Sequence, residues 1–226
     1  MPNINIVKYL PKSESYNFRY VCDRYDLDVS KFNKNWSIEF DFPKEWSIGL
    51  IVGNSGSGKS LISKEIFKKV YLGQIIQETQ IPLIETFSDI PIDKIISALS
   101  SVGMGSVPEW LTPYSCLSTG QKMRADLAYC LLSDEEIIAY DEFTSVVDRQ
   151  VAKIVSHSIA KAFRKKNKKF VAITCHHDVE EWLEPDWVLD MDVQEYRTSQ
   201  KKNPQFPFQY TPVKDPLGNF SKIITI

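Results

Sequence analysis

The 226-residue sequence has no apolar run approaching the 18 or so residues of a membrane-spanning helix. Its first residues, MPNINIVKYLPK, lack the apolar core and the small-residue cleavage site of a signal peptide. The four cysteines show no C-x-x-C spacing, which argues against a metal site and favours reduced thiols in a cytoplasmic protein. No internal repeat is visible, and the net charge of −2 gives no overall attraction to nucleic acid or anionic lipid.

What the sequence does contain is the octapeptide GNSGSGKS at residues 53–60, which matches G-x-x-x-x-G-K-[ST] at every fixed position. Glycines let backbone N–H groups point at phosphate oxygens, Lys59 can reach the β- and γ-phosphates, and Ser60 can hold Mg²⁺. An apolar run at 46–52 and a helical pattern at 60–72 flank the loop, which favours a nucleoside triphosphate site over a glycine-rich turn. The residues predicted to contact the nucleotide here are Gly53, Asn54, Ser55, Gly56, Ser57, Gly58, Lys59, Ser60 and Leu61.

Two further motifs follow along the chain. Residues 117–121 read LSTGQ and precede a helical pattern that runs to Leu132, although a serine in that position is ordinarily only a helix cap. Residues 137–142 read IIAYDE, an apolar strand with two acids at its C-terminal end, where ligands bind in open α/β sheets. The pair suits magnesium binding by Asp141 and activation of water by Glu142, against the alternative of two solvated turn carboxylates.

Apolar periodicity predicts an α/β fold with a mixed central sheet, preceded by an antiparallel β layer in residues 1–50. Strands are expected at 4–10, 16–21, 36–42, 46–52, 81–84, 137–140, 170–174 and 187–191. Helices are expected at 60–72, 91–102, 122–132 and 149–165. The last residues suggest a hairpin with strands at 208–210 and 223–226.

Aromatic residues are frequent upstream of the glycine-rich loop. An aromatic ring there can stack on a purine, although most such rings are expected to be core or sheet-face residues. The candidates are Tyr16, Phe18, Tyr20, Tyr25, Phe32 and Trp36.

In this order and spacing, the motifs resemble those of the ATP-binding-cassette (ABC) ATPases. The resemblance covers residues 46–191. The matches are residues 53–60 with the Walker A loop, 117–121 with the LSGGQ signature, 137–142 with Walker B and its catalytic glutamate, 142–148 with the stretch ending in the D-loop aspartate, and His176 with the switch histidine. His177 is the alternative for the last position.

The resemblance implies a P-loop NTPase that uses ATP and Mg²⁺ in a head-to-tail homodimer, with each ATP held between one Walker A loop and the other subunit's signature. Carried over, Ser60 and Asp141 hold Mg²⁺. Glu142 polarises the attacking water, and His176 contacts the γ-phosphate. Ser118 and Gly120 are expected to contact the γ-phosphate of the other subunit's nucleotide, and Thr119, Gln121 and Asp148 are also expected in the nucleotide site.

The whole chain, 1–226, is expected to form a single ABC-type domain. Its parts are predicted as the N-terminal β layer (1–50), the P-loop core (51–86 and 133–192), a shortened helical subdomain with the signature (87–132) and a C-terminal hairpin or tail (193–226).

The sequence departs from the family pattern at several positions. Thr119 replaces the first signature glycine, and Phe143 replaces the proline usual after the glutamate; both changes look tolerable. The Q-loop glutamine is unassigned. Its candidates are Gln74, Gln77 and Gln80, with Glu85 standing where glutamine is expected.

A basic run lies at the end of the predicted helix 149–165. It contains Lys161, Arg164, Lys165, Lys166, Lys168 and Lys169. Cations there complement a helix dipole and commonly form a solvated end, while the alternative is a phosphate-backbone patch for nucleic acid.

The interval from Lys59 to Ser118 is only 118 − 59 = 59 positions, shorter than in transporter subunits of the family. Gln121 and Lys122 resemble the signature of SMC-like ATPases, and the whole pattern resembles small stand-alone ABC ATPases encoded largely by phages and mobile elements. We therefore expect a soluble ATPase that acts on nucleic acid or a protein assembly. The alternatives are the ATP-binding subunit of a membrane transporter and a low-turnover ATP-dependent switch.

Overall fold

The computed structural model describes residues 3–8, 13–32, 34–67, 69–72, 75–77, 80–87, 89–199, 213–214 and 220–221. Its centre is a six-stranded sheet with strand order β4-β5-β6-β3-β7-β8, parallel except for the edge strand β8. The strands are β3 (Ile48–Val52), β4 (Val70–Tyr71), β5 (Ile137–Tyr140), β6 (Lys169–Thr174), β7 (Trp187–Asp190) and β8 (Glu195–Thr198). Parallel strands buried on both faces read as continuous apolar runs, which is why four of these strands could be recognised in the sequence.

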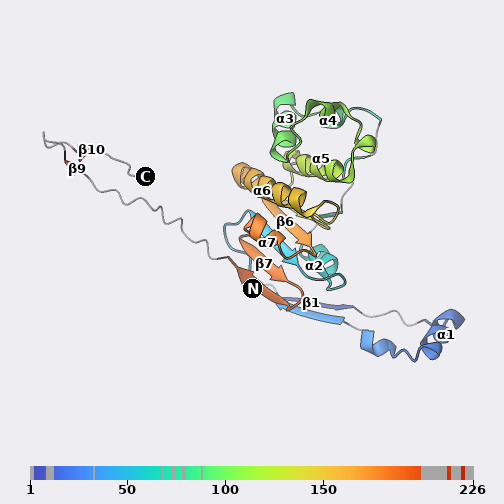
Figure 1. The fold of residues 1–226 in the computed structure, drawn as a ribbon. Coiled ribbons are helices and arrows are strands. Elements are labelled where there is room, and N and C mark those ends of the chain that lie inside the picture. The colour runs from blue at the N-terminus through green and yellow to red at the C-terminus, as the bar shows by residue number, and fades with distance from the viewer. Residues whose placement is uncertain are drawn as a thin grey trace.

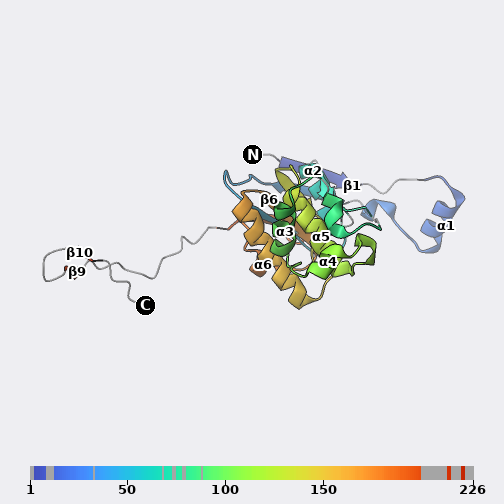
Figure 2. The same cartoon turned by 90° about the horizontal axis from the view of Figure 1, so that it is seen from above.

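The sheet is covered on both faces (Figures 1 and 2). On one face, alternate residues of β3 such as Leu50 pack with α5 (Thr119–Leu132) and α6 (Arg149–Lys166). On the other face, Ile51 packs with α2 (Lys59–Ile66) and with an aromatic layer. That layer comes from β2 (Lys34–Glu39) and the residues after it, and β2 pairs antiparallel with β1 (Asn3–Lys8).

A helical part lies beyond α6, shown in green at one end of the molecule in Figure 1. It contains α3 (Ile92–Ser101), α4 (Val107–Leu111) and α5, with the 3₁₀ turns η2 (Leu83–Phe87) and η3 (Tyr114–Cys116). On α3, Ile95, Ala98 and Leu99 are buried against α5, the spacing expected of a helix with one apolar face. The predicted helix at 91–102 is confirmed.

The predicted strand at 16–21 is wrong, because these residues form the helix α1 (Tyr16–Arg24). The Ser15 hydroxyl caps this helix by accepting a hydrogen bond from the Phe18 N–H, and the rings of Tyr16 and Tyr20 stack at one helical turn, 6.1 Å apart. Aromatics at every second position also fit a strand, so the alternation was ambiguous over so short a segment. The helix α1 buries no residue, and it projects away from the rest of the molecule in both views (Figures 1 and 2).

Two other predictions between the glycine-rich loop and the helical part need correction. The helix predicted at 60–72 ends at Ile66, because Phe67 is extended and Val70–Tyr71 form β4 beside β5. The strand predicted at 81–84 is a single bridge followed by the 3₁₀ turn η2. Pro82 makes that bridge with Pro113, and proline has no N–H with which to continue a ladder.

The edge strand β8 was not predicted from the sequence. Its sequence, EYRT, is polar because β8 is an edge strand with partly exposed residues, so it lacks an apolar run. Farther on, β9 (Val213–Lys214) pairs antiparallel with β10 (Phe220–Ser221). The predicted hairpin strands at 208–210 and 223–226 lie outside the described residues, as does Gln74.

A buried carboxylate joins the helix α5 to the segment that follows β4. Asp126 of α5 is 1% exposed. It accepts hydrogen bonds from the hydroxyl of Tyr114 (3.0 Å), from the N–H of Ile75 (3.1 Å) and from the N–H of Ile76 (3.2 Å). Burying a polar group lowers the stability of the fold unless the group is hydrogen-bonded. The bonds between Asp126 and these donors therefore offset the desolvation of both sides.

We expect Asp126→Ala to lower the free energy of unfolding by about 2–4 kcal/mol, because the substitution leaves a buried hydroxyl, a buried N–H group and a partly buried N–H group without their acceptor. Urea denaturation measures this change. Tyr114→Phe is the matched variant, since it removes one of the bonds and is expected to cost about 1 kcal/mol. An Asp126→Ala protein as stable as the wild type would contradict the importance of the network.

Candidate nucleotide site

The glycine-rich loop joins the C-terminal end of β3 to the first turn of α2. Gly58 is the N-cap of α2 and has a φ of +101°, a backbone conformation that residues with a side chain rarely adopt. Inside the loop, the N–H of Ser57 donates to the carbonyl of Asn54 at 3.1 Å. The loop therefore curls back on itself at the positive end of a helix, which is the geometry of an anion site.

Lys59 lies over this loop. Its ammonium group donates to the carbonyl oxygens of Gly53 at 2.6 Å and of Asn54 at 2.7 Å. These bonds hold the positive charge of Lys59 against the backbone of the glycine-rich loop, as the G-x-x-x-x-G-K-[ST] pattern predicted. Ser60 follows on the first turn of α2, and Leu61 comes next with its side chain partly buried.

Asp192, which the sequence reading missed, also holds the loop. It follows β7, and its carboxylate accepts from the N–H of Asn54 at distances of 2.8 and 3.1 Å. The only local signal was an acid just beyond the C-terminal end of a buried strand, the same signal that pointed to Asp141.

The two predicted acids lie where β5 ends. Asp141 is 5% exposed, its N–H donates to the carbonyl of Tyr71 at 2.7 Å, and its carboxylate accepts from the N–H of Glu142 at 2.9 Å. Glu142 itself is exposed and has a φ of +56°. Non-glycine residues in this region cost of order 1 kcal/mol and concentrate at functional sites.

Phe143 explains how the chain turns after Glu142 without the usual proline. Its side chain is fully buried and contacts Tyr140 and Phe170, and its N–H donates to the carbonyl of Ile173 at 2.9 Å. A proline could not make that bond, because it has no N–H. The phenylalanine therefore anchors the turn by packing and by a backbone bond.

The signature segment begins α5. The Ser118 hydroxyl accepts from the N–H of Gln121, and the Gln121 side chain accepts from the N–H of Ser118 at 2.9 Å, which forms a capping box. Gln121 also donates to Glu109 of α4 at 3.0 Å. Gly120 packs so closely on Val147 that an added Cβ would lie 3.0 Å from a methyl carbon of that valine.

The start of α5 and the end of β5 meet at one cavity. A cavity of about 180 Å³ is lined by Thr119, Asp141 and Glu142, among others. The structure thus brings the signature and the two acids together within one chain. Asp148 lies at the N-terminus of α6, where its side chain accepts from the N–H groups of Gln150 and Val151.

The two histidine candidates differ in what they contact. The His177 ring nitrogen lies 3.3 Å from the Asp192 carboxylate, which in turn holds the loop at Asn54. His176 donates its backbone N–H to the hydroxyl of Thr174 at 3.2 Å. Asp178, which follows the two histidines, is bonded to the Arg149 guanidinium, which holds the pKa of that carboxyl below its usual range. The choice of His176 as the switch residue stays a prediction. Of the two histidines, His177 is the one connected to the glycine-rich loop, through Asp192.

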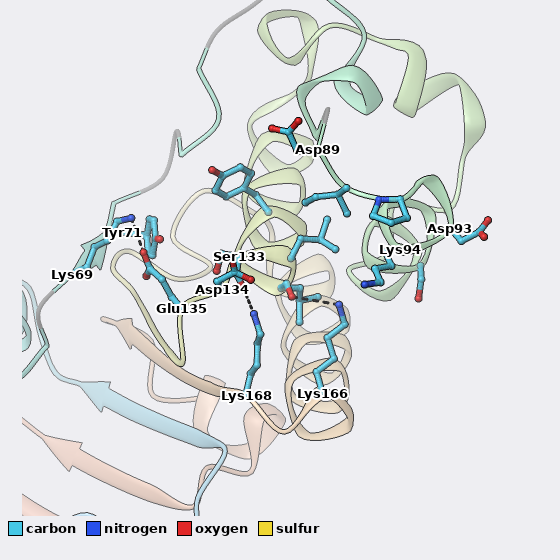
Figure 3. A pocket seen from close by; sticks show the side chains of 16 residues that line it. Lys69, Tyr71, Asp89, Asp93, Lys94, Ser133, Asp134, Glu135, Lys166 and Lys168 are labelled. Carbon is cyan, nitrogen blue, oxygen red and sulfur yellow. Dashed lines mark hydrogen bonds and ion pairs between the residues drawn. The ribbon is translucent and has the colours of Figure 1, made fainter.

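Part of the basic run lies at a different place, on a cleft of about 1040 Å³ between α3 and the C-terminal ends of α5 and α6 (Figure 3). Lys166 and Lys168 line this cleft. They donate to the carbonyls of Leu131 and Ser133 at the end of α5. Burial lowers the pKa of both lysines.

The neighbouring cations in the run are also bonded within the chain. Lys169 pairs with Glu136 at 2.6 Å, and Arg164 donates to the carbonyl of Leu183 at 3.1 Å. Nucleic-acid binding by the run is not shown, and three of its cations, Arg164, Lys166 and Lys168, donate to carbonyls at the ends of α5 and α7 (Val179–Leu183). Lys161 and Lys165 lie on α6 as predicted.

Comparison with known proteins gives three results. No protein-family model matches the chain. The Energy-coupling factor transporter ATP-binding protein EcfA1 of Staphylococcus aureus (strain USA300) is 26% identical over 213 residues, which cover 77% of each chain. A solved ABC transporter in an inward-facing conformation has a TM-score of 0.56 at 16% identity, over 87% of this chain and 92% of that one.

Two further solved structures share the fold. The cbiO1 protein of Clostridium perfringens, part of the ABC transporter complex cbiONQ, has a TM-score of 0.52 at 17% identity, over 70% of this chain and 76% of that one. A dimeric bacterial ABC transporter cassette has a TM-score of 0.53 at 13% identity, over 73% and 92%. These similarities support the ABC ATPase family. The predicted fold class, an ABC-type P-loop fold with a mixed sheet, is confirmed.

The predicted function of this ABC-type chain needs correction. A process on nucleic acid or on a protein assembly was expected, but the similar proteins are a transporter ATP-binding protein, an ABC transporter and a part of an ABC transporter complex. The short interval before the signature and the Gln121-Lys122 pair were therefore misleading. Within the part of the chain that the structure describes, no helix is long and apolar enough to cross a membrane.

Proposed function

We propose that the chain is the ATP-binding and ATP-hydrolysing subunit of a membrane transporter whose spanning part is a separate chain. The observation that carries this proposal is the likeness to EcfA1 over 77% of both chains, combined with a glycine-rich loop in which Lys59 is already held over the backbone. A relative bound to ADP and Pi in a post-hydrolysis state supports hydrolysis as the reaction.

The loop and the start of α2 would bind the phosphates. Lys59 would exchange its bonds to two loop carbonyls for bonds to phosphate oxygens, which bear more negative charge. The N-terminus of α2 adds the positive end of the helix dipole. Phosphoryl transfer depends mainly on such positioning and charge stabilisation, so a preformed loop contributes directly to the rate.

The residues present fit a magnesium ion. Ser60, on the first turn of α2, offers a hydroxyl, and Asp141, at the end of β5, offers a carboxylate; these are the oxygen ligands that Mg²⁺ prefers. The ion would neutralise charge on the phosphates when bound. Glu142, exposed at the next position, would orient and deprotonate the attacking water.

We propose further that two copies associate head to tail. In a single chain, Gly120 of the signature packs on Val147, and Thr119 lines the same cavity as Asp141 and Glu142. A second copy would bring its signature to the phosphates, as the dimeric form of a related cassette suggests. The narrower resemblance to stand-alone phage-encoded ATPases stays a prediction.

Co-purification tests the transporter assignment. The tagged full-length protein is recovered from detergent-solubilised membranes of its native cell, and the proteins recovered with it are identified by mass. We expect a polytopic membrane protein at near-equal amount, and ATPase activity that changes when the two are reconstituted in vesicles. An active ATPase that is recovered without any membrane protein, and that vesicles do not affect, would overturn the assignment.

A further inference from the structure

Trp36 contacts the glycine-rich loop from the N-terminal β layer. Its indole N–H donates to the carbonyl of Ser57 at 2.8 Å, and the side chain is 4% exposed. The ring also lies against Gly58, since a Cβ built on that glycine would be 2.7 Å from two of its ring carbons. One side chain therefore holds two successive residues of the loop.

The position of Trp36 is fixed by the layer that carries it. It lies on β2 and is followed on the same face by Ile38 and Phe40, which are buried with Ile51 of β3 and Ile62 of α2. The indole is thus packed between the loop and the core rather than exposed beside it. Tyr16, Tyr20 and Tyr25, three of the other aromatics considered for base stacking, are exposed on or next to the projecting α1.

The bond to Ser57 has a geometric consequence. The peptide joining Ser57 to Gly58 is planar and trans, so its C=O and its N–H point in opposite directions. Because the C=O is directed at Trp36, the N–H of Gly58 is directed away from it, toward the other side of the loop. Backbone N–H groups of such a loop are the donors that cradle phosphates.

The ring supports the same arrangement by packing. Gly58 has a φ of +101°, and the indole fills the space that a side chain at this position would occupy. Glycine-rich segments have many accessible conformations. If such a loop becomes ordered only when a ligand binds, the loss of conformational entropy lowers the affinity for that ligand. A loop held at Ser57 and Gly58 is ordered before a ligand arrives.

We propose that Trp36 is a positioning residue for the nucleotide phosphates, which orients the Ser57–Gly58 peptide and so sets the affinity of the loop. This inference rests on the proposed nucleotide-binding function. It assigns Trp36 to the phosphates and not to the base, because its N–H and its ring are both engaged by the loop.

The test uses Trp36→Phe, which keeps an aromatic ring and removes the N–H. We expect the dissociation constant for ATP and the KM to rise by about 3- to 10-fold, as for the loss of one hydrogen bond, with kcat within about 2-fold of wild type. The matched control is Trp46→Phe. Trp46 belongs to the same buried cluster, where it stacks on Phe42 and meets Trp187 edge to face, and the change removes an indole N–H there as well.

Two comparisons make the result decisive. Inorganic tripolyphosphate should lose affinity for the Trp36→Phe protein by the same factor as ATP, whereas a loss for ATP alone would mean base stacking and would overturn the inference. Equal affinities in the Trp36→Phe and Trp46→Phe proteins would overturn it too. A wild-type protein that fails to bind ATP would instead remove the proposed function, and urea denaturation of both variants separates affinity from stability.

Discussion

Replacing Glu142 with glutamine is expected to stop ATP hydrolysis while leaving ATP binding intact. Glutamine has the same shape but cannot take a proton, and general-base assistance is worth about 10²- to 10⁴-fold in rate. The backbone around this residue is fixed independently of its carboxylate: the Glu142 N–H is bonded to Asp141, and its carbonyl accepts from the Ser145 hydroxyl at 2.7 Å. The substitution should therefore change the chemistry without changing the turn.

A stalled site should also accumulate the dimer. If ATP lies between two chains, hydrolysis is what separates them, so the Glu142→Gln protein should elute as a dimer with saturating ATP and Mg²⁺. The matched control is Glu136→Gln, an exposed acid just before β5, at the end of that strand away from Glu142. A Glu142→Gln protein that stays a monomer would contradict the shared site, and one that hydrolyses ATP at the wild-type rate would contradict the role of Glu142.

Replacing Lys59 with alanine is expected to abolish detectable ATP binding. The ammonium group lies within 2.7 Å of two loop carbonyls, so it is held where phosphate oxygens would bind. Hydrogen bonds to charged groups contribute about 1.5–3 kcal/mol each. Losing one such bond to phosphate lowers the affinity for ATP by at least about 10-fold, and losing two lowers it by more than about 100-fold. Isothermal titration calorimetry measures the change.

The control for Lys59→Ala is Lys64→Ala on the same helix. Lys64 is exposed in the last turn of α2, so both substitutions remove one positive charge from the same helix. We expect Lys64→Ala to bind ATP like the wild type. Retained affinity in the Lys59→Ala protein would contradict the identification of the loop as a phosphate site.

The elements of the site that the sequence predicted are the local ones. The loop, the strand ending at Asp141 and the helix that begins after Ser118 are each specified by residues within a few positions of one another. The resemblance to ABC ATPases rested on these motifs, and the fold it implied is confirmed.

What the sequence did not predict is contact between distant segments. Asp192 bonds to Asn54 across 138 positions, and Trp36 bonds to Ser57 across 21, so neither partner can be found by spacing. The error at α1 has a different cause. Over the six residues 16–21, the spacing of the aromatic side chains fits both a strand and a helix, so the pattern cannot distinguish the two. The kind of partner was mispredicted because the motifs bind nucleotide, and they carry no information about what the rest of the surface contacts.

One short segment connects the acid at the proposed metal site to the signature helix. The carbonyl of Tyr71 accepts from the N–H of Asp141, and four positions later the N–H of Ile75 donates to the buried carboxylate of Asp126 on α5. If the helical part rotates against the sheet, it pulls on residues 75 and 76, and that pull reaches Tyr71 through very little intervening chain. We therefore expect the tilt of α5 and occupancy at the end of β5 to influence one another through the bonds at Tyr71 and Ile75.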